Sequence, residues 1–150
     1  HFGYRRQRQM CIRDSHGRCF AGNTALLACC DVIIATKDST IAMGGPAMIE
    51  GGGLGIYTPE EVGPMSFQVP NGVVDILVED EAEAVRVAKQ YLSYFQGSTD
   101  SWEAPDQRKL RHIVPENRLR LYDMREIIAT LADKDSVLEI RAGFGVGVIT

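Results

Sequence analysis

The segment Asp31–Thr36 constrains the fold more than any other part of this sequence. It reads Asp-Val-Ile-Ile-Ala-Thr, which is apolar and rich in β-branched residues. Such a run favours extended backbone and is typical of a buried strand. Good helix formers precede it at residues 24–28, directly after Gly22-Asn23. We therefore predict a helix that begins near Gly22, followed by a buried strand over residues 31–36.

Helices and strands alternate along the rest of the chain, which favours a mixed α/β fold. Thr58-Pro59-Glu60-Glu61 is a helix start with a capping box, and Asp80 with Glu83 forms a second cap. The helix that follows Asp80 is expected to reach about Phe95 and to bury one apolar face. That face comprises Val85, Ala88, Leu92 and Phe95. The other expected elements are strands at 40–43, 73–78 and 137–140, a linker or loop from Gly97 to Arg111, and a helix capped by Asp123 that buries Ile127, Ile128 and Leu131.

Composition and charge restrict the expected partners. The 150 residues carry a formal net charge of −4. Residues 1–15 hold four arginines and one aspartate, so the remainder has 12 basic and 19 acidic residues and a charge of −7. A net charge of −7 on residues 16–150 disfavours nucleic acid as a partner. No apolar run approaches the roughly 20 residues that span a bilayer, so no membrane partner is expected.

Cysteine and histidine usage indicates neither a disulfide framework nor a metal site. Cys29 and Cys30 are adjacent on an apolar stretch, where thiols usually behave as buried small hydrophobes. A reducing, cytoplasmic compartment is the default for such usage. His16 and His112 lie at no ligand spacing with a cysteine, so no metal is expected.

The first 15 residues differ from the rest in origin or order. Met10–Ser15 reads Met-Cys-Ile-Arg-Asp-Ser, which back-translates to a sequence resembling the transposon-end adapter of sequencing libraries. We interpret residues 1–15 as adapter-derived, and the alternative is a disordered tail. The chain starts at His1 and ends on the apolar run 146–150, so we expect it to be a fragment.

Two glycine-containing turns are the best candidates for a site, because common signatures such as GxGxxG, GxxxxGK[ST], GxSxG and HExxH are absent. Ala21-Gly22-Asn23 stands at a predicted helix start, where free backbone N–H groups can stabilise an oxyanion. Gly44-Gly45-Pro46 belongs to a glycine-dense stretch that lets a ligand or a second backbone approach closely. For each turn the alternative is a structural turn without a ligand.

Three further groups have simpler interpretations. Glu60-Glu61 could act as a paired acid and base, but the capping role already explains both residues. His112 is most simply a surface histidine. The basic residues could meet phosphates, or they could form a solvated face or pair with acidic residues. They are Arg108, Lys109, Arg111, Arg118 and Arg120.

Several segments, in order, resemble the carboxyltransferase component of biotin-dependent acyl-CoA carboxylases, the group of acetyl-CoA and propionyl-CoA carboxylases. The resemblance covers about residues 16–150 and rests on the order and spacing of its motifs. These are Gly17–Asn23, Asp31–Ile34, Gly45-Pro46, Glu60–Gly63, Asn71–Asp75, Val114–Asn117 and Tyr122–Ile128.

The resemblance implies a crotonase-like (ClpP/crotonase) α/β fold of repeated ββα units, present here in part. It implies transfer of a carboxyl group from carboxybiotin to the α-carbon of an acyl-CoA, acetyl-CoA or propionyl-CoA like. Gly22 and Asn23 would then donate backbone hydrogen bonds to the thioester oxygen beside Ala21, and Gly44, Gly45 and Pro46 would line the substrate. The implied partners are a biotin carboxyl carrier domain, a biotin carboxylase domain and further copies of the carboxyltransferase.

The resemblance also divides the chain. Residues 16–97 correspond to the C-terminal part of the N-terminal carboxyltransferase half, 98–121 to a linker, and 122–150 to the start of the C-terminal half. Ala21 departs from the family's glycine-rich oxyanion turn. Two alternatives stay open: a crotonase-type enoyl-CoA hydratase or isomerase, which would need catalytic carboxylates, and a non-catalytic dimerisation module.

Overall fold

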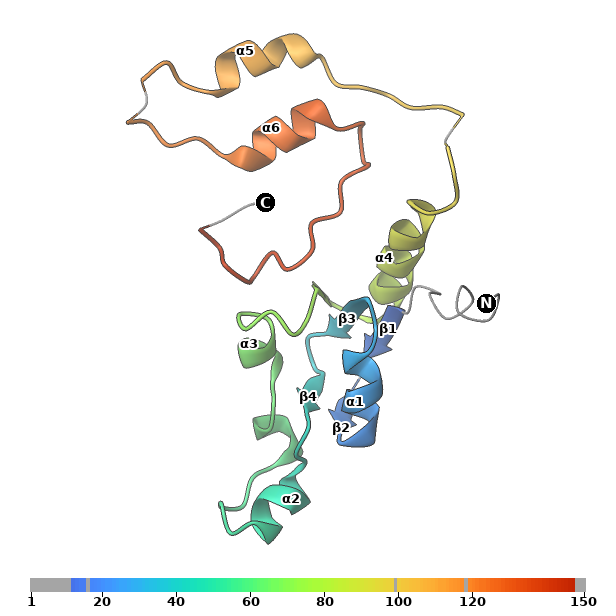
Figure 1. The fold of residues 1–150 in the computed structure, drawn as a ribbon, viewed down its shortest axis with the longest axis vertical. Coiled ribbons are helices and arrows are strands. Elements are labelled where there is room, and N and C mark those ends of the chain that lie inside the picture. Colours follow the sequence, from blue (N-terminus) through green and yellow to red (C-terminus); the bar gives the residue numbers. More distant parts are fainter. Residues whose placement is uncertain (1–11, 16, 99, 118, 148–150) are drawn as a thin grey trace, which may run out of the picture.

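The structure, a computed structural model, describes residues 12–15, 17–98, 100–117 and 119–147 (Figure 1). Its elements follow one another in a mixed α/β order. They are β1 (Ile12–Ser15), β2 (Arg18–Phe20), α1 (Gly22–Ala28), β3 (Val32–Thr36), β4 (Thr40–Ala42), α2 (Pro46–Gly51), a 3₁₀ turn (Pro59–Glu61), α3 (Met65–Gln68), β5 (Ile76–Val78), α4 (Glu81–Ser93), a 3₁₀ turn (Gln107–Lys109), α5 (Leu110–Ile113) and α6 (Met124–Leu131).

Strands alternate between two parallel sheets. One sheet has the order β1-β3-β5, and the other pairs β2 with β4. Ile12 is opposite Val32 in the first sheet, and Arg18 is opposite Thr40 in the second. Parallel neighbours need a crossover, and here each crossover contains a strand of the other sheet and at least one helix. The chain therefore repeats a strand–strand–helix pattern.

β3 lies at the centre of the core, as its apolar composition predicted. All five of its residues are buried. Because side chains alternate along a strand, Ile33 and Ala35 face one cluster while Val32 and Ile34 face the other. The first cluster comprises Cys19, Leu27, Ile33, Ala35, Ile41, Met65 and Val74. The second comprises Val32, Ile34, Val78, Ala84 and Val87, with Ile76, Ala88, Tyr91 and Leu138 packed against it.

Helix α4 begins as predicted but buries a different face. Asp80 caps it by accepting a hydrogen bond from the N–H of Glu83 at 2.8 Å. Ala84 and Val87 are the buried residues, with Ala88 and Tyr91 beside them. The expected face is wrong except at Ala88. Val85 is 49%, Leu92 41% and Phe95 58% exposed. Ala84 and Val87 pack against the face of β3 that carries Val32 and Ile34.

Other expected boundaries also differ. The strand expected at 73–78 is confined to residues 76–78, because the N–H groups of Val73 and Val74 both donate to the carbonyl of Gln68. The glycine-dense stretch contains a helix that the sequence did not predict, α2, with Pro46 in its first turn. The strand expected at 137–140 is absent from the described chain, where that segment pairs with no strand. The expected linker holds α5 and the 3₁₀ turn before it.

The C-terminal part is less buried than the sequence suggested. Asp123 caps α6 through the N–H of Arg125. Ile127 and Ile128 are only partly buried and Leu131 is 57% exposed, so the buried stripe is wrong. Thr130 is the buried residue of α6.

Residues 12–15 of the segment interpreted as adapter-derived or disordered form β1, while residues 1–11 lie outside the described residues. In the part of the chain that the structure describes, no helix is both long and apolar enough to cross a bilayer.

Gly63 provides a test of this packing. Its φ is +68°, and a Cβ there would lie 2.0 Å from the carbonyl oxygen of Ile41, whose N–H donates to the Gly63 carbonyl at 2.9 Å. We expect Gly63→Ala to lower the free energy of unfolding by more than about 2 kcal/mol in urea denaturation, because steric overlap adds to the backbone penalty. Gly53→Ala is the control: φ is +70° but nothing lies within 4 Å. Equal losses for both variants would contradict the steric account.

Candidate functional site

Ala21 links β2 to α1 in a conformation that L-residues rarely adopt. Its φ is 52° and its ψ is −122°. Its N–H donates to the carbonyl of Met43 at 3.2 Å, which holds the turn beside the end of β4. Strained backbone of this kind costs about 1–3 kcal/mol and is often found at functional sites. The turn is therefore held in place by its surroundings.

The first residues of α1 supply backbone donors at this turn. The initial N–H groups of a helix have no acceptor within it. No side chain caps α1, and its first turn contains no acidic residue. Ala21, Gly22 and Asn23 are all exposed. The N–H groups of Gly22 and Asn23 thus stand at the positive end of a short helix, where they can bind an anionic oxygen.

The two predicted turns lie next to each other. Phe20 pairs with Ala42 across the β2–β4 ladder, and the Phe20 ring lies 3.6 Å from the position of a Cβ on Gly45. The Thr24 hydroxyl lies 2.8 Å from the carbonyl oxygen of Cys19 and 2.9 Å from that of Ala42, so α1 is tied to both strands. The structure therefore brings Ala21-Gly22-Asn23 and Gly44-Gly45-Pro46 together.

Glu60 and Glu61 have the roles that the simpler interpretation gave them. Glu61 accepts from the N–H of Thr58 at 2.7 Å in a capping box, and these hydrogen bonds lower the pKa of its carboxyl group. Arg18 lies 2.5 Å from Glu60 and lowers the pKa of that carboxyl by hydrogen bonding. Both side chains are held in the ionised form, which disfavours a role as general acid.

The other candidates gather at no site. His112 is exposed, and Arg108 pairs with Asp106 at 2.7 Å on the surface. Arg118 lies outside the described residues. Cys29 is exposed and Cys30 half-buried, so the expectation of buried thiols is wrong for this pair. Among the described residues, no group of three or more histidine, cysteine or acidic side chains could hold a metal ion.

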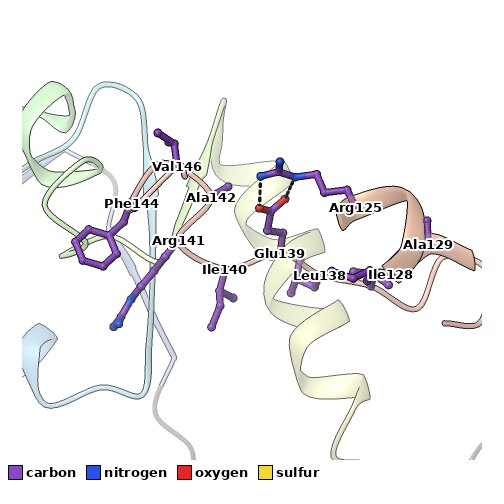
Figure 2. A pocket seen from close by; sticks show the side chains of 12 residues that line it. Arg125, Ile128, Ala129, Leu138, Glu139, Ile140, Arg141, Ala142, Phe144 and Val146 are labelled. Carbon is purple, nitrogen blue, oxygen red and sulfur yellow. Dashed lines mark hydrogen bonds and ion pairs between the residues drawn. The ribbon is translucent and has the colours of Figure 1, made fainter. Parts of the chain in front are cut away.

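A cavity lies elsewhere, between α6 and the segment 137–146 (Figure 2). Its volume is about 820 Å³, and none of the predicted site residues lines it. Arg125 binds Glu139 through two hydrogen bonds of 3.0 and 2.6 Å on its wall. Arg141 and Phe144 point away from this pair (Figure 2). This cavity is therefore separate from the two predicted turns.

Comparison with known proteins identifies the family. The model of the carboxyl transferase domain matches residues 14–150. The chain belongs to the carboxyl transferase domain family. A carboxylase of Bacillus subtilis (strain 168), YngE, is 30% identical over 153 residues, covering 95% of this chain and 29% of that protein. The methylmalonyl-CoA carboxyltransferase 12S subunit of Propionibacterium freudenreichii subsp. shermanii is 30% identical over 143 residues, covering 89% and 27%.

Solved carboxyltransferase structures share this fold. A single-chain, multi-domain long-chain acyl-CoA carboxylase matches with a TM-score of 0.89 and 59% identity over 93% of this chain and 14% of that chain. The hexameric transcarboxylase 12S, with hydrolysed methylmalonyl-CoA bound, matches with a TM-score of 0.75 and 28% identity over 90% and 28%. The chain thus spans less than a third of each of these relatives.

Sequence reasoning located both turns but missed what holds them. The glycine-like φ of Ala21 has no signal in an alanine, because that residue usually avoids such backbone. Thr24 was assigned only to the predicted helix, yet it is 7% exposed and bonds two strands. A hydroxyl in the first turn of a helix was the available hint.

The strain at Ala21 leads to a stability prediction. We expect Ala21→Gly to raise the free energy of unfolding by about 1 kcal/mol in urea denaturation, since relief of 1–3 kcal/mol of strain exceeds the entropy cost of glycine. Ala25→Gly, at an exposed position inside α1, is the control and should lower it by about 1 kcal/mol. Changes of the same sign in both variants would refute strain at Ala21.

The carboxyl groups of Glu60 and Glu61 lead to a pH prediction. Both have pKa values below the ordinary 4.5, so their contribution to stability is present above that value and lost as the pH falls through the folded pKa. Arg18→Gln should return the pKa of Glu60 toward 4.5 and leave Glu61 lowered, as measured by NMR titration of the side-chain carboxyl carbons. An unchanged Glu60 pKa would exclude Arg18 as the cause.

Proposed function

We propose that this chain is part of an acyl-CoA carboxyltransferase of crotonase-like fold. The repeated strand–strand–helix pattern and the family membership support the fold. The transfer moves a carboxyl group from N1-carboxybiotin, carried by a partner domain, to the α-carbon of an acyl-CoA. The observation that carries the proposal is the turn Ala21-Gly22-Asn23, with its uncapped N–H groups beside Gly44-Gly45-Pro46.

The chemistry of the turn fits enolate stabilisation. Removing the α-proton of a thioester places negative charge on the thioester oxygen, and preorganised donors lower the energy of that charge. In this proposal Gly22 and Asn23 donate their N–H groups to the oxygen, while the side-chain-poor Gly44 and Gly45 let the substrate approach. Biotin supplies the carboxyl group when its carrier domain is bound.

The substrate class follows less directly. The sequence resemblance implied acetyl-CoA or propionyl-CoA, whereas 59% identity to a long-chain acyl-CoA carboxylase favours a longer acyl chain. Exposed apolar side chains flank the turn Gly44-Gly45-Pro46, one directly before it and the others on and after α2, which favours an apolar group nearby. They are Met43, Met48, Leu54, Ile56 and Tyr57.

The alternatives receive less support. An enoyl-CoA hydratase or isomerase would use catalytic carboxylates, and Glu60 and Glu61 are committed to Arg18 and Thr58. A non-catalytic dimerisation module gives no reason for a strained turn with uncapped donors.

The proposal predicts a reaction of the complete protein that carries these residues. Carboxyl exchange between malonyl-CoA-type thioesters and free biotin should be measurable, with an acyl-CoA series from acetyl to palmitoyl defining the preferred chain. Hydration of crotonyl-CoA is the assay for the alternative enzyme. Hydration without carboxyl exchange would refute the proposal, and neither activity would favour the dimerisation module.

A charge introduced at Asn23 tests the turn itself. An acidic residue in the first turn of a helix is stabilising, but it repels an oxyanion. Asn23→Asp should therefore keep or raise thermal stability while lowering kcat/KM for exchange by roughly 10²-fold. Asn23→Ala retains the backbone N–H and should remain within a few-fold of the wild type. Equal rates for Asn23→Asp and wild type would remove the turn from the mechanism.

A further inference from the structure

Asp75 makes four hydrogen bonds that join distant parts of the chain. Its N–H donates to the carbonyl of Ile33 at 3.0 Å, and its Oδ2 accepts from the Ile33 N–H at 2.8 Å. Its carbonyl oxygen accepts from the Arg141 N–H at 2.6 Å, and its Oδ1 accepts from Arg141 Nε at 2.7 Å. Asp75 therefore joins β3 to Arg141, which lies 66 positions after Asp75 in the chain.

The burial of Asp75 makes the loss of any of these hydrogen bonds costly. The Asp75 side chain is 5% exposed, while that of Arg141 is 53% exposed. A buried carboxylate that loses a partner must find another donor or move toward water. Arg141 itself has a φ of +56°, a conformation that persists only where its surroundings fix it.

Gly143 and Phe144, which follow Arg141, lie close to Val69 and Gly72, which precede Asp75. A Cβ on Gly143 would lie 2.4 Å from Cγ1 of Val69. The Phe144 ring lies 3.0 Å from the position of a Cβ on Gly72. Close approach at both glycines shows that the segment 137–146 is docked beside Asp75.

Ile33 connects this junction to the candidate oxyanion turn. Its side chain packs in the cluster that contains Cys19 of β2 and Leu27 of α1, the two elements on either side of Ala21. Ile41 of β4, which precedes Gly44, belongs to the same cluster. Ile33 thus packs with residues of β2, α1 and β4, the three elements that flank the two turns.

We propose that Asp75 is a positioning residue that couples docking of the segment 137–146 to the geometry of the oxyanion turn. Arg141 holds the carboxylate in place, the carboxylate holds Ile33, and Ile33 supports β2 and α1. The role of the turn rests on the function proposed above, whereas the coupling itself is a property of the contacts.

Hydrogen exchange of the complete protein tests the coupling without reference to activity. Asp75→Asn keeps an oxygen for the Ile33 N–H but turns donors toward Arg141, and Arg141→Gln removes the charge. Both should speed exchange in residues 18–27 by roughly tenfold or more. The change in α4 should be smaller, because α4 packs on the other face of β3 and contacts this segment only through the cluster that includes Leu138. Arg141→Lys retains the charge, so exchange in residues 18–27 should lie between that of Arg141→Gln and that of the wild type. Arg108→Gln breaks an exposed pair remote from Asp75 and should change nothing in residues 18–27.

Kinetics then separate positioning from general stability. Asp75→Asn and Arg141→Gln should lower kcat for carboxyl exchange by roughly tenfold or more, with KM for the acyl-CoA within about threefold, because small displacements of catalytic groups act mainly on the reacting state. Unchanged exchange in residues 18–27, or an equal rise there and in α4, would overturn the coupling. Selective exchange changes in a protein without carboxyl transfer would support the coupling and reject the proposed function.

Discussion

Burial of β3 on both faces is the constraint on which the other elements depend. A strand without a polar side needs cover in both directions, and the two clusters that share it supply that cover. Helix α1 and β4 close one face, and α4 closes the other. The second sheet is then fixed beside the first, because β2 follows β1 after two residues and β4 follows β3 after three. The candidate site lies at the ends of β2 and β4, so its location depends on how the second sheet is held beside the first.

The parts of the fold that were predictable carry their cause locally. The apolar run of β3, the Asp80 cap and the Thr58–Glu61 capping box are each specified within a few residues. The segment 137–140 has the composition of a strand, but strand formation needs a partner, and none is present among the described strands. The face of α4 was not predictable from periodicity, because apolar residues lie on more than one side of the helix: Ala84 and Val87 are buried while Val85 is exposed.

The candidate site shows the same division. Resemblance of short motifs pointed to Ala21-Gly22-Asn23 and to Gly44-Gly45-Pro46 as separate turns. Their proximity arises from the β2–β4 register, which is a long-range property that no local pattern contains. The positive φ of Ala21 was equally hidden, because tertiary contacts impose it against the preference of the residue. The structure thus shows two features that the motifs do not: the two turns lie together, and the backbone of Ala21 is strained.

The separation between Asp75 and Arg141 has a consequence for synthesis on the ribosome. Strands β1 to β5 are complete at Val78, roughly 60 residues before Arg141 is added. At about 5–20 residues per second, that interval lasts roughly 3–12 s. During this time the nascent sheet can form while one oxygen of the Asp75 carboxylate still faces water. We therefore expect the Asp75 carboxylate to stay hydrated through early folding and to become buried when the segment that carries Arg141 docks.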